Sequence, residues 1–155
     1  MTGWRIGYAA GPDYLIKAMA KIQGQSTSNP CSVSQKAAEA ALRGEQTCIQ
    51  QMLMAFKERH DWVVNELNTL PGIECLAGDG TFYAFFKVSD LLDQIPSISN
   101  DTELAEHLIN EANIALVPGS AFGCPGYLRL SFATSLDILQ EAIQRLRQTI
   151  AKHIS

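Results

Sequence analysis

The stretch YLRLSFA, residues 127–133, contains a clear strand pattern. Side chains alternate along it, so two leucines share one face while Arg129 lies on the other face with Tyr127 and Ser131. Burying a guanidinium is costly unless a carboxylate or a phosphate pairs with it. The pattern therefore leaves two possibilities open. Arg129 binds an anion in a site, or it has an ordinary role, with a local carboxylate as partner or on an exposed edge strand.

Further strands and helices are predicted on both sides of this stretch. The segment IALVPG, residues 114–119, predicts a strand, and GTFYAFFKV predicts an aromatic strand at 81–88 after a short strand in LPGIECL. Apolar residues at helical spacing predict helices at about 100–112, where Asn100 and Glu103 have capping-box spacing, and from about Ser135. The fold class is α+β, a short sheet with helices on one face.

The first 45 residues form a different pattern. Trp4, Ile6 and Tyr8 alternate with Arg5 and a glycine, which predicts a strand and raises the same question about an arginine's anion. A short helix is predicted after Pro12, and it should end near Gly24. Two more helices are predicted between residues 33 and 70, separated at Gly44.

Composition limits the class of protein. The chain has 155 residues, 46% of them hydrophobic and 18% charged, which is typical of a globular protein with a sizeable core. A net charge of -4 with dispersed basic residues argues against nucleic acid as a partner. No apolar run is long enough to span a membrane, and no signal peptide is visible. We therefore expect a cytoplasmic protein with four reduced cysteines and no membrane partner.

The histidines do not predict a metal site. His60, His107 and His153 fall in three separate predicted helices without metal-ligand spacing, and the cysteines contain no C-x-x-C pair. We expect the histidines at the surface or at its boundary with the core.

Five blocks in order, MTGWRIGYAAGP, QSTSNPCSVSQ, GTFYAFF, ALVPGSAFG and YLRLSFATS, resemble the C-terminal part of a class I aminotransferase. This family belongs to the fold-type I superfamily that uses pyridoxal phosphate, and the similarity is greatest to bacterial aspartate aminotransferases. The resemblance implies that Arg5 binds the cofactor phosphate and that Arg129 binds the α-carboxylate of the substrate. A guanidinium suits both anions because its fork of donors matches oxyanion geometry.

The resemblance also implies a parent enzyme. It would exchange amino groups between an L-amino acid, aspartate above all, and 2-oxoglutarate, as a homodimer of α/β superfamily fold. Its Schiff-base lysine would lie a few residues before Met1. We therefore expect this chain to be a fragment, to hold no catalytic residue, and to be inactive without bound cofactor. Residues 1–45 would be a remnant of the large cofactor-binding domain, and residues 46–155 the small C-terminal domain.

Two alternatives stay open at this point. The chain could be a non-catalytic binding or interaction module on the same scaffold, or the parent could act on aromatic amino acids or alanine. If residues 1–30 are a remnant, we expect Trp4, Ile6, Tyr8 and Leu15 to expose apolar surface and the segment to be less ordered than the rest.

Overall fold

The computed structural model describes residues 1–154, without the side chain of Thr2. The chain divides into two compact units, Met1–Gln50 and Gln51–Ser155. Each unit is considered by itself. Whether the first unit is a remnant of a larger domain stays a prediction.

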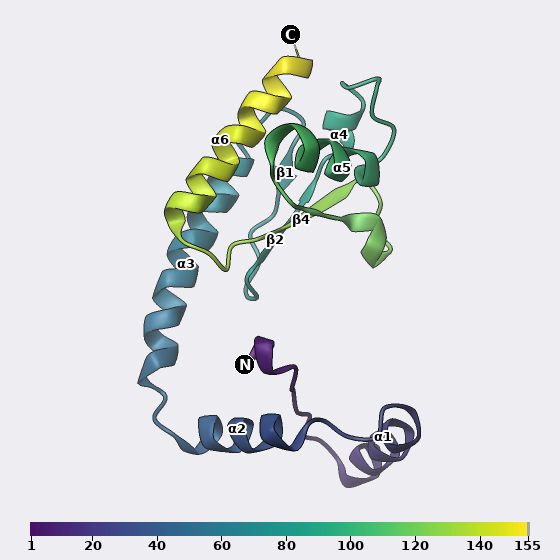
Figure 1. Ribbon diagram of the computed structural model, residues 1–155, viewed down its shortest axis with the longest axis vertical. Coiled ribbons are helices and arrows are strands. Elements are labelled where there is room, and N and C mark those ends of the chain that lie inside the picture. Colours follow the sequence, from purple (N-terminus) through teal and green to yellow (C-terminus); the bar gives the residue numbers. More distant parts are fainter. Residues whose placement is uncertain (155) are drawn as a thin grey trace. The chain divides into compact units, whose positions relative to one another are not determined.

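The second unit contains a small antiparallel sheet of four strands (Figure 1). Their bounds are β1 Glu74–Cys75, β2 Tyr83–Lys87, β3 Val117–Pro118 and β4 Tyr127–Ser131. The order in the sheet is β1-β2-β4-β3, which makes β2 and β4 the inner strands. Each predicted strand of this unit is present, although β1 and β3 have only two residues each, and the α+β prediction is confirmed.

One face of the sheet packs on helices (Figure 1). These helices are α3 Thr47–Leu67, α5 Asp101–Ala112 and α6 Leu136–His153, and α3 and α6 lie side by side, with Arg147 bonding to Glu66 and Thr69 at 2.9 Å. The core combines leucine, isoleucine and valine from the helices with alternate residues of β2 and β4, among them Phe86 and Leu128. Alternation leaves the other face of β2 and β4 outside this core.

Local signals position α5 and α6 as the sequence predicts. The Asn100 side chain accepts hydrogen bonds from the backbone N–H groups of Thr102 and Glu103, and the Glu103 carboxylate accepts one from the Ser99 N–H at 2.7 Å. At the start of α6, the Ser135 side chain accepts one hydrogen bond, from the backbone N–H of Ile138. A short helix, α4 Ser89–Leu92, was not predicted because four residues are too few for a periodic pattern.

The first unit contains α1 Asp13–Ser26 and α2 Ser32–Arg43 after a 3-10 turn, η1 Thr2–Trp4. The predicted strand around Arg5 is wrong. Arg5 follows η1 in a turn with φ of 52°, and no described strand pairs with residues 4–8. Residues that alternate between apolar and other types form a strand only when a neighbouring strand supplies the backbone hydrogen bonds. Helix α1 also continues two residues beyond Gly24.

Three of the four apolar residues expected to be exposed in the first unit are exposed, whereas Ile6 is half-buried. Trp4 is 51% exposed, Tyr8 81% and Leu15 46%, and α1 has no buried residue. Among the described residues, no helix is both long and apolar enough to cross a membrane.

Candidate functional site

Arg129 lies at the centre of β4, on the face of the sheet opposite the helices. Its neighbours Leu128 and Leu130 are buried in the core, while Arg129 itself is half-buried, as the alternation in the sequence predicted. Its cross-strand partners are Phe85 on β2 and Val117 on β3. The arginine therefore lies on an inner strand, and its main chain is held on both sides.

The guanidinium of Arg129 contacts two aromatic rings. Cζ of Arg129 lies 4.3 Å from the ring centroid of Tyr83 on β2 and 4.6 Å from that of Phe122 in a second 3-10 turn, η2 Gly119–Phe122. Phe85 stacks on Tyr127 beside them, with centroids 5.0 Å apart and rings inclined by 11°. Contact of this kind is attractive to the cation and restricts the plane of the guanidinium, and it leaves the N–H donors able to bind an anion.

Neither ordinary role that the sequence left open for Arg129 is found among the described residues, and its role in binding an anion stays a prediction. Among the described residues, no carboxylate forms an ion pair with it, and β4 is not an edge strand. A half-buried cation held by aromatic rings without a local counter-charge has the chemistry of an anion site.

Arg5 belongs to the first unit and is exposed. Its φ of 52° is the left-handed region, which is uncommon for residues other than glycine. In the same unit Arg43 forms an ion pair with Glu39 at 2.9 Å. The exposed guanidinium of Arg5 has the donor geometry that a phosphate requires, so it fits the phosphate of pyridoxal phosphate by its chemistry. Its role stays a prediction.

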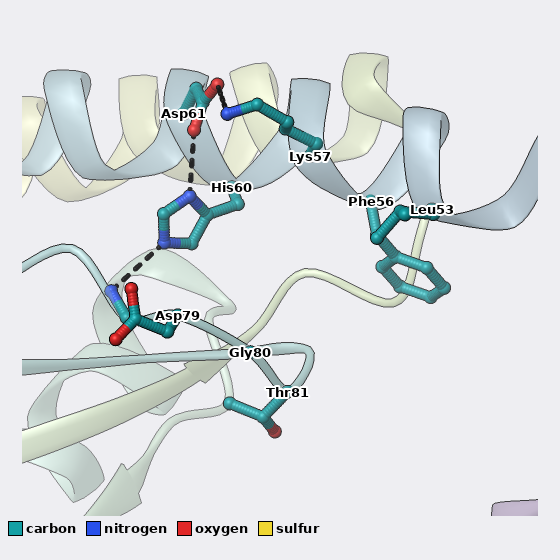
Figure 2. A pocket seen from close by; sticks show the side chains of 9 residues that line it. Leu53, Phe56, Lys57, His60, Asp61, Asp79, Gly80 and Thr81 are labelled. Atoms are coloured by element: carbon teal, nitrogen blue, oxygen red, sulfur yellow. Dashed lines mark hydrogen bonds and ion pairs between the residues drawn. The ribbon is translucent and has the colours of Figure 1, made fainter. Parts of the chain in front are cut away.

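A separate pocket of about 280 Å³ lies between α3 and the turn before β2 (Figure 2). Leu53, Phe56, Lys57, His60 and Asp61 line it from α3, together with residues 78–81 of the turn. It does not include Arg129. The sequence analysis did not predict it, because its two sides are brought together only by tertiary packing.

His60 fastens the turn to α3 in this pocket (Figure 2). The backbone N–H of Gly78 donates to Nε2 of His60 at 3.2 Å, so that nitrogen is an acceptor and the proton is on Nδ1, which faces Asp61 Oδ1 at 2.9 Å. A hydrogen bond from Lys57, and then the one from His60, lower the pKa of the Asp61 carboxyl. Because both ring nitrogens are engaged, His60 acts as a structural link and not as a free base.

The other two histidines form a pair that the sequence did not reveal. His107 on α5 and His153 on α6 have their Nε2 atoms 3.0 Å apart, and their rings meet edge to face. All three histidines lie at the boundary between core and surface, as predicted. Within residues 1–154 no cluster of three or more potential metal ligands is found.

Residues 1–146 match the model of one protein family, described as aminotransferase class I and II. The chain belongs to this aminotransferase family. It is 51% identical over 156 aligned residues to the aspartate/prephenate aminotransferase of Nitrosomonas europaea, an alignment that covers 97% of this chain.

Solved structures of aminotransferases have the same fold. The aspartate aminotransferase of Rhizobium meliloti aligns with a TM-score of 0.81 and 44% identity, over 100% of this chain and 40% of that one. The aromatic aminotransferase of Pyrococcus horikoshii aligns with a TM-score of 0.79 and 33% identity, over 98% of this chain and 40% of that one. The chain spans 39% of the length of its Nitrosomonas relative.

The sequence did not reveal that the rings of Tyr83 and Phe122 contact Arg129. Tyr83 is part of the aromatic strand pattern, and Phe122 is part of a loop that the sequence marks only by its glycines and proline. A partial signal was present in the sequence. Three of the four residues in YAFF are aromatic, so most registers of this strand would place an aromatic residue opposite Arg129. The contribution of Phe122 depends on how the loop folds back.

Proposed function

We propose that residues 1–155 supply the substrate-carboxylate site of an aminotransferase that uses pyridoxal phosphate, with Arg129 as the residue that binds the α-carboxylate. The observation that carries the proposal is the half-buried Arg129 guanidinium, which contacts the rings of Tyr83 and Phe122 and has no carboxylate partner among the described residues. The similarity to aminotransferases supports it.

The geometry gives Arg129 a positioning task. A guanidinium can bind both oxygens of a carboxylate through parallel N–H···O bonds, which fixes the orientation of the amino acid as well as its affinity. The flanking rings limit rotation of the guanidinium, so less conformational entropy is lost when the carboxylate binds. Pyridoxal phosphate, when bound, supplies the electron sink for the amino-transfer chemistry. Arg129 would hold the amino acid in register with it.

Aspartate is the proposed amino donor and 2-oxoglutarate the acceptor. The similarity to the aspartate/prephenate aminotransferase of Nitrosomonas europaea and to the aspartate aminotransferase of Rhizobium meliloti supports aspartate. The aromatic aminotransferase of Pyrococcus horikoshii, which has the same fold at 33% identity, favours aromatic amino acids as the second candidate. Kinetics with both donors separates these possibilities.

Further parts of the proposal concern the whole enzyme. Arg5 would bind the cofactor phosphate, since its guanidinium is exposed and suits that anion. The catalytic lysine would come from sequence before Met1, and the enzyme would work as a cytoplasmic homodimer.

A chimaera tests the role of Arg129. Residues 1–155 replace the matching segment of the Nitrosomonas europaea relative, and kcat/KM for aspartate is measured for the chimaera and for its Arg129→Ala variant. Each charge-assisted hydrogen bond lost should lower kcat/KM about 10- to 100-fold, while the visible spectrum of the bound cofactor is retained. Arg59→Ala is the control, because Arg59 also lies over an aromatic ring, at 5.5 Å from Phe56, but outside the site. An unchanged kcat/KM for Arg129→Ala would contradict the proposal.

The alternative of a non-catalytic module is tested on the 155-residue chain itself. The chain is titrated with pyridoxal phosphate, reduced with borohydride and mapped by peptide mass. We expect no stoichiometric adduct, because the catalytic lysine is proposed to lie elsewhere. A single stoichiometric adduct, for example on Lys17 or Lys21, would show that the chain makes its own cofactor linkage. A chimaera without cofactor binding or activity would favour the non-catalytic module.

A further inference from the structure

A buried carboxylate connects α5 to the turn that contains Phe122. Asp101 is the first residue of α5, and only 2% of its surface is exposed. Its Oδ2 accepts a hydrogen bond from the backbone N–H of Ser120 at 2.7 Å. The hydroxyls of Thr102 and Ser120 form a second contact at 3.3 Å. A buried carboxyl group is retained only where hydrogen-bond partners satisfy it, as the Ser120 N–H does here.

The turn η2 is tightly packed, so the position of Ser120 constrains the positions of the residues that follow it. The Cys124 N–H donates to the carbonyl of Gly119, and Gly123, with φ of 73°, closes the turn. A Cβ on Gly119 would lie 2.3 Å from the Cys124 carbonyl oxygen and 2.7 Å from Cβ of Tyr127. The start of η2 is thus in direct contact with the start of β4, and a shift of Ser120 must move the residues that follow it.

Phe122, two residues after Ser120, is the part of the turn that reaches Arg129. Its side chain is 52% exposed, so the core does not hold it. The ring contacts Arg129 at 4.6 Å and meets the edge of Phe85 at a centroid distance of 6.5 Å. The backbone of η2, which Asp101 holds, therefore determines where this half-exposed ring lies.

We propose that Asp101 is a positioning residue for the substrate-carboxylate site. Its hydrogen bond to Ser120 fixes η2, η2 fixes Phe122, and Phe122 with Tyr83 sets the plane of the Arg129 guanidinium. This inference rests on the proposed function of Arg129, but its structural part can be tested without it. Replacing Asp101 with alanine leaves the Ser120 N–H without its acceptor, whereas asparagine keeps a side-chain oxygen that can accept the same bond.

The first test measures the Arg129 Nε–H resonance by NMR in the 155-residue chain. A proton held over the face of an aromatic ring is shifted upfield, so Asp101→Ala, by displacing Phe122, should move this signal downfield, towards its position in Phe122→Leu. Ser120→Pro removes the same hydrogen bond from the donor side and keeps the test decisive if Asp101→Ala does not fold. Asp137→Ala is the matched control, because Asp137 also lies in the first turn of a helix but is exposed. An Arg129 signal unchanged in Asp101→Ala, or in Ser120→Pro, would overturn the inference.

The second test measures kinetics in the chimaera. Asp101→Ala should raise KM for aspartate roughly tenfold, the equivalent of about 1.4 kcal/mol, with kcat changed little, and Asp101→Asn should restore most of the loss. A merely structural role would lower the amount of active enzyme without raising KM. If Arg129→Ala weakens aspartate binding and Asp101→Ala leaves KM unchanged, only this inference fails. If Arg129→Ala itself has no effect, the proposed function fails.

Discussion

The two units of the chain use similar apolar residues with opposite results. In residues 51–154, side chains from α3, α5, α6 and the sheet form one continuous core in which Phe86 and Val63 are fully buried. In residues 1–50, Ser34 is the one buried side chain among those described, and large apolar residues such as Tyr14 and Ile22 are 77% and 70% exposed. Periodic apolar residues are thus sufficient to form a helix, but a core requires a second surface that matches the apolar face.

The two candidate anion-binding arginines, one in each unit, also differ in their surroundings. Arg129 is held in place by strands on both sides and by two rings, whereas Arg5 lies in an exposed turn. A binding residue needs support from its surroundings to hold one geometry. Residues 51–154 give Arg129 that support.

The largest effect should come from removing a core ring. Phe86→Ala in the second unit should lower the free energy of unfolding by about 3–5 kcal/mol, because it leaves a cavity in a packed core. Ile22→Ala in the first unit should change it by less than about 0.5 kcal/mol, because the side chain is mostly exposed. Urea unfolding is followed by the fluorescence of Trp62 in a Trp4→Phe background, which leaves one tryptophan.

If Phe86→Ala and Ile22→Ala lowered the free energy of unfolding equally, the contrast between a packed second unit and an exposed first unit would be contradicted. A large loss for Ile22→Ala would mean that α1 has a packed partner in solution. In that case the midpoint for Ile22→Ala should depend on protein concentration if the partner is a second copy of the chain.

An intermediate effect is expected from two glycine substitutions. Gly119→Ala should destabilise the second unit by about 1–3 kcal/mol, since its Cβ would overlap the Cys124 carbonyl oxygen and Tyr127. Gly24→Ala should stabilise α1 by roughly 0.5–1 kcal/mol, because Gly24 is within a helix and nothing lies within 4 Å of a Cβ there. Urea unfolding measures the first and helical circular dichroism the second. A stabilising Gly119→Ala would show that η2 is loosely packed.

The smallest perturbation is a chemical probe of the cysteines. Backbone N–H groups at the start of α2, that of Ser34 above all, lower the pKa of the exposed Cys31 thiol, while burial raises the pKa of Cys75. A lower pKa gives a larger thiolate fraction at neutral pH, so Cys31 should react with iodoacetamide faster in the native chain than in urea. Cys75 should react only when the second unit unfolds. Mass spectrometry of peptides after timed quenching measures both rates, and native alkylation of Cys75 as fast as Cys31 would contradict the comparison.

Local information in the sequence was sufficient for most of the second unit. The alternation in residues 127–133 placed Arg129 opposite its two leucine neighbours, and the spacing of Asn100 and Glu103 located the start of α5. Both features depend on residues within four positions of one another, so they can be read without the rest of the fold. The strand predicted around Arg5 was wrong because strand pairing depends on a distant segment.

The sequence alone was sufficient to indicate the family of this chain, the two arginines that could bind anions, and the helices and strands from about residue 70 onward except the short α4. Three contacts became visible only in the folded structure: the rings of Tyr83 and Phe122 lie against Arg129, the Ser120 N–H bonds to buried Asp101, and His60 links α3 to Gly78. The physical reason is the range of the interactions. Propensity, periodicity and capping act over a few residues, whereas ring contacts and buried hydrogen bonds join segments that come together only when the sheet and helices pack.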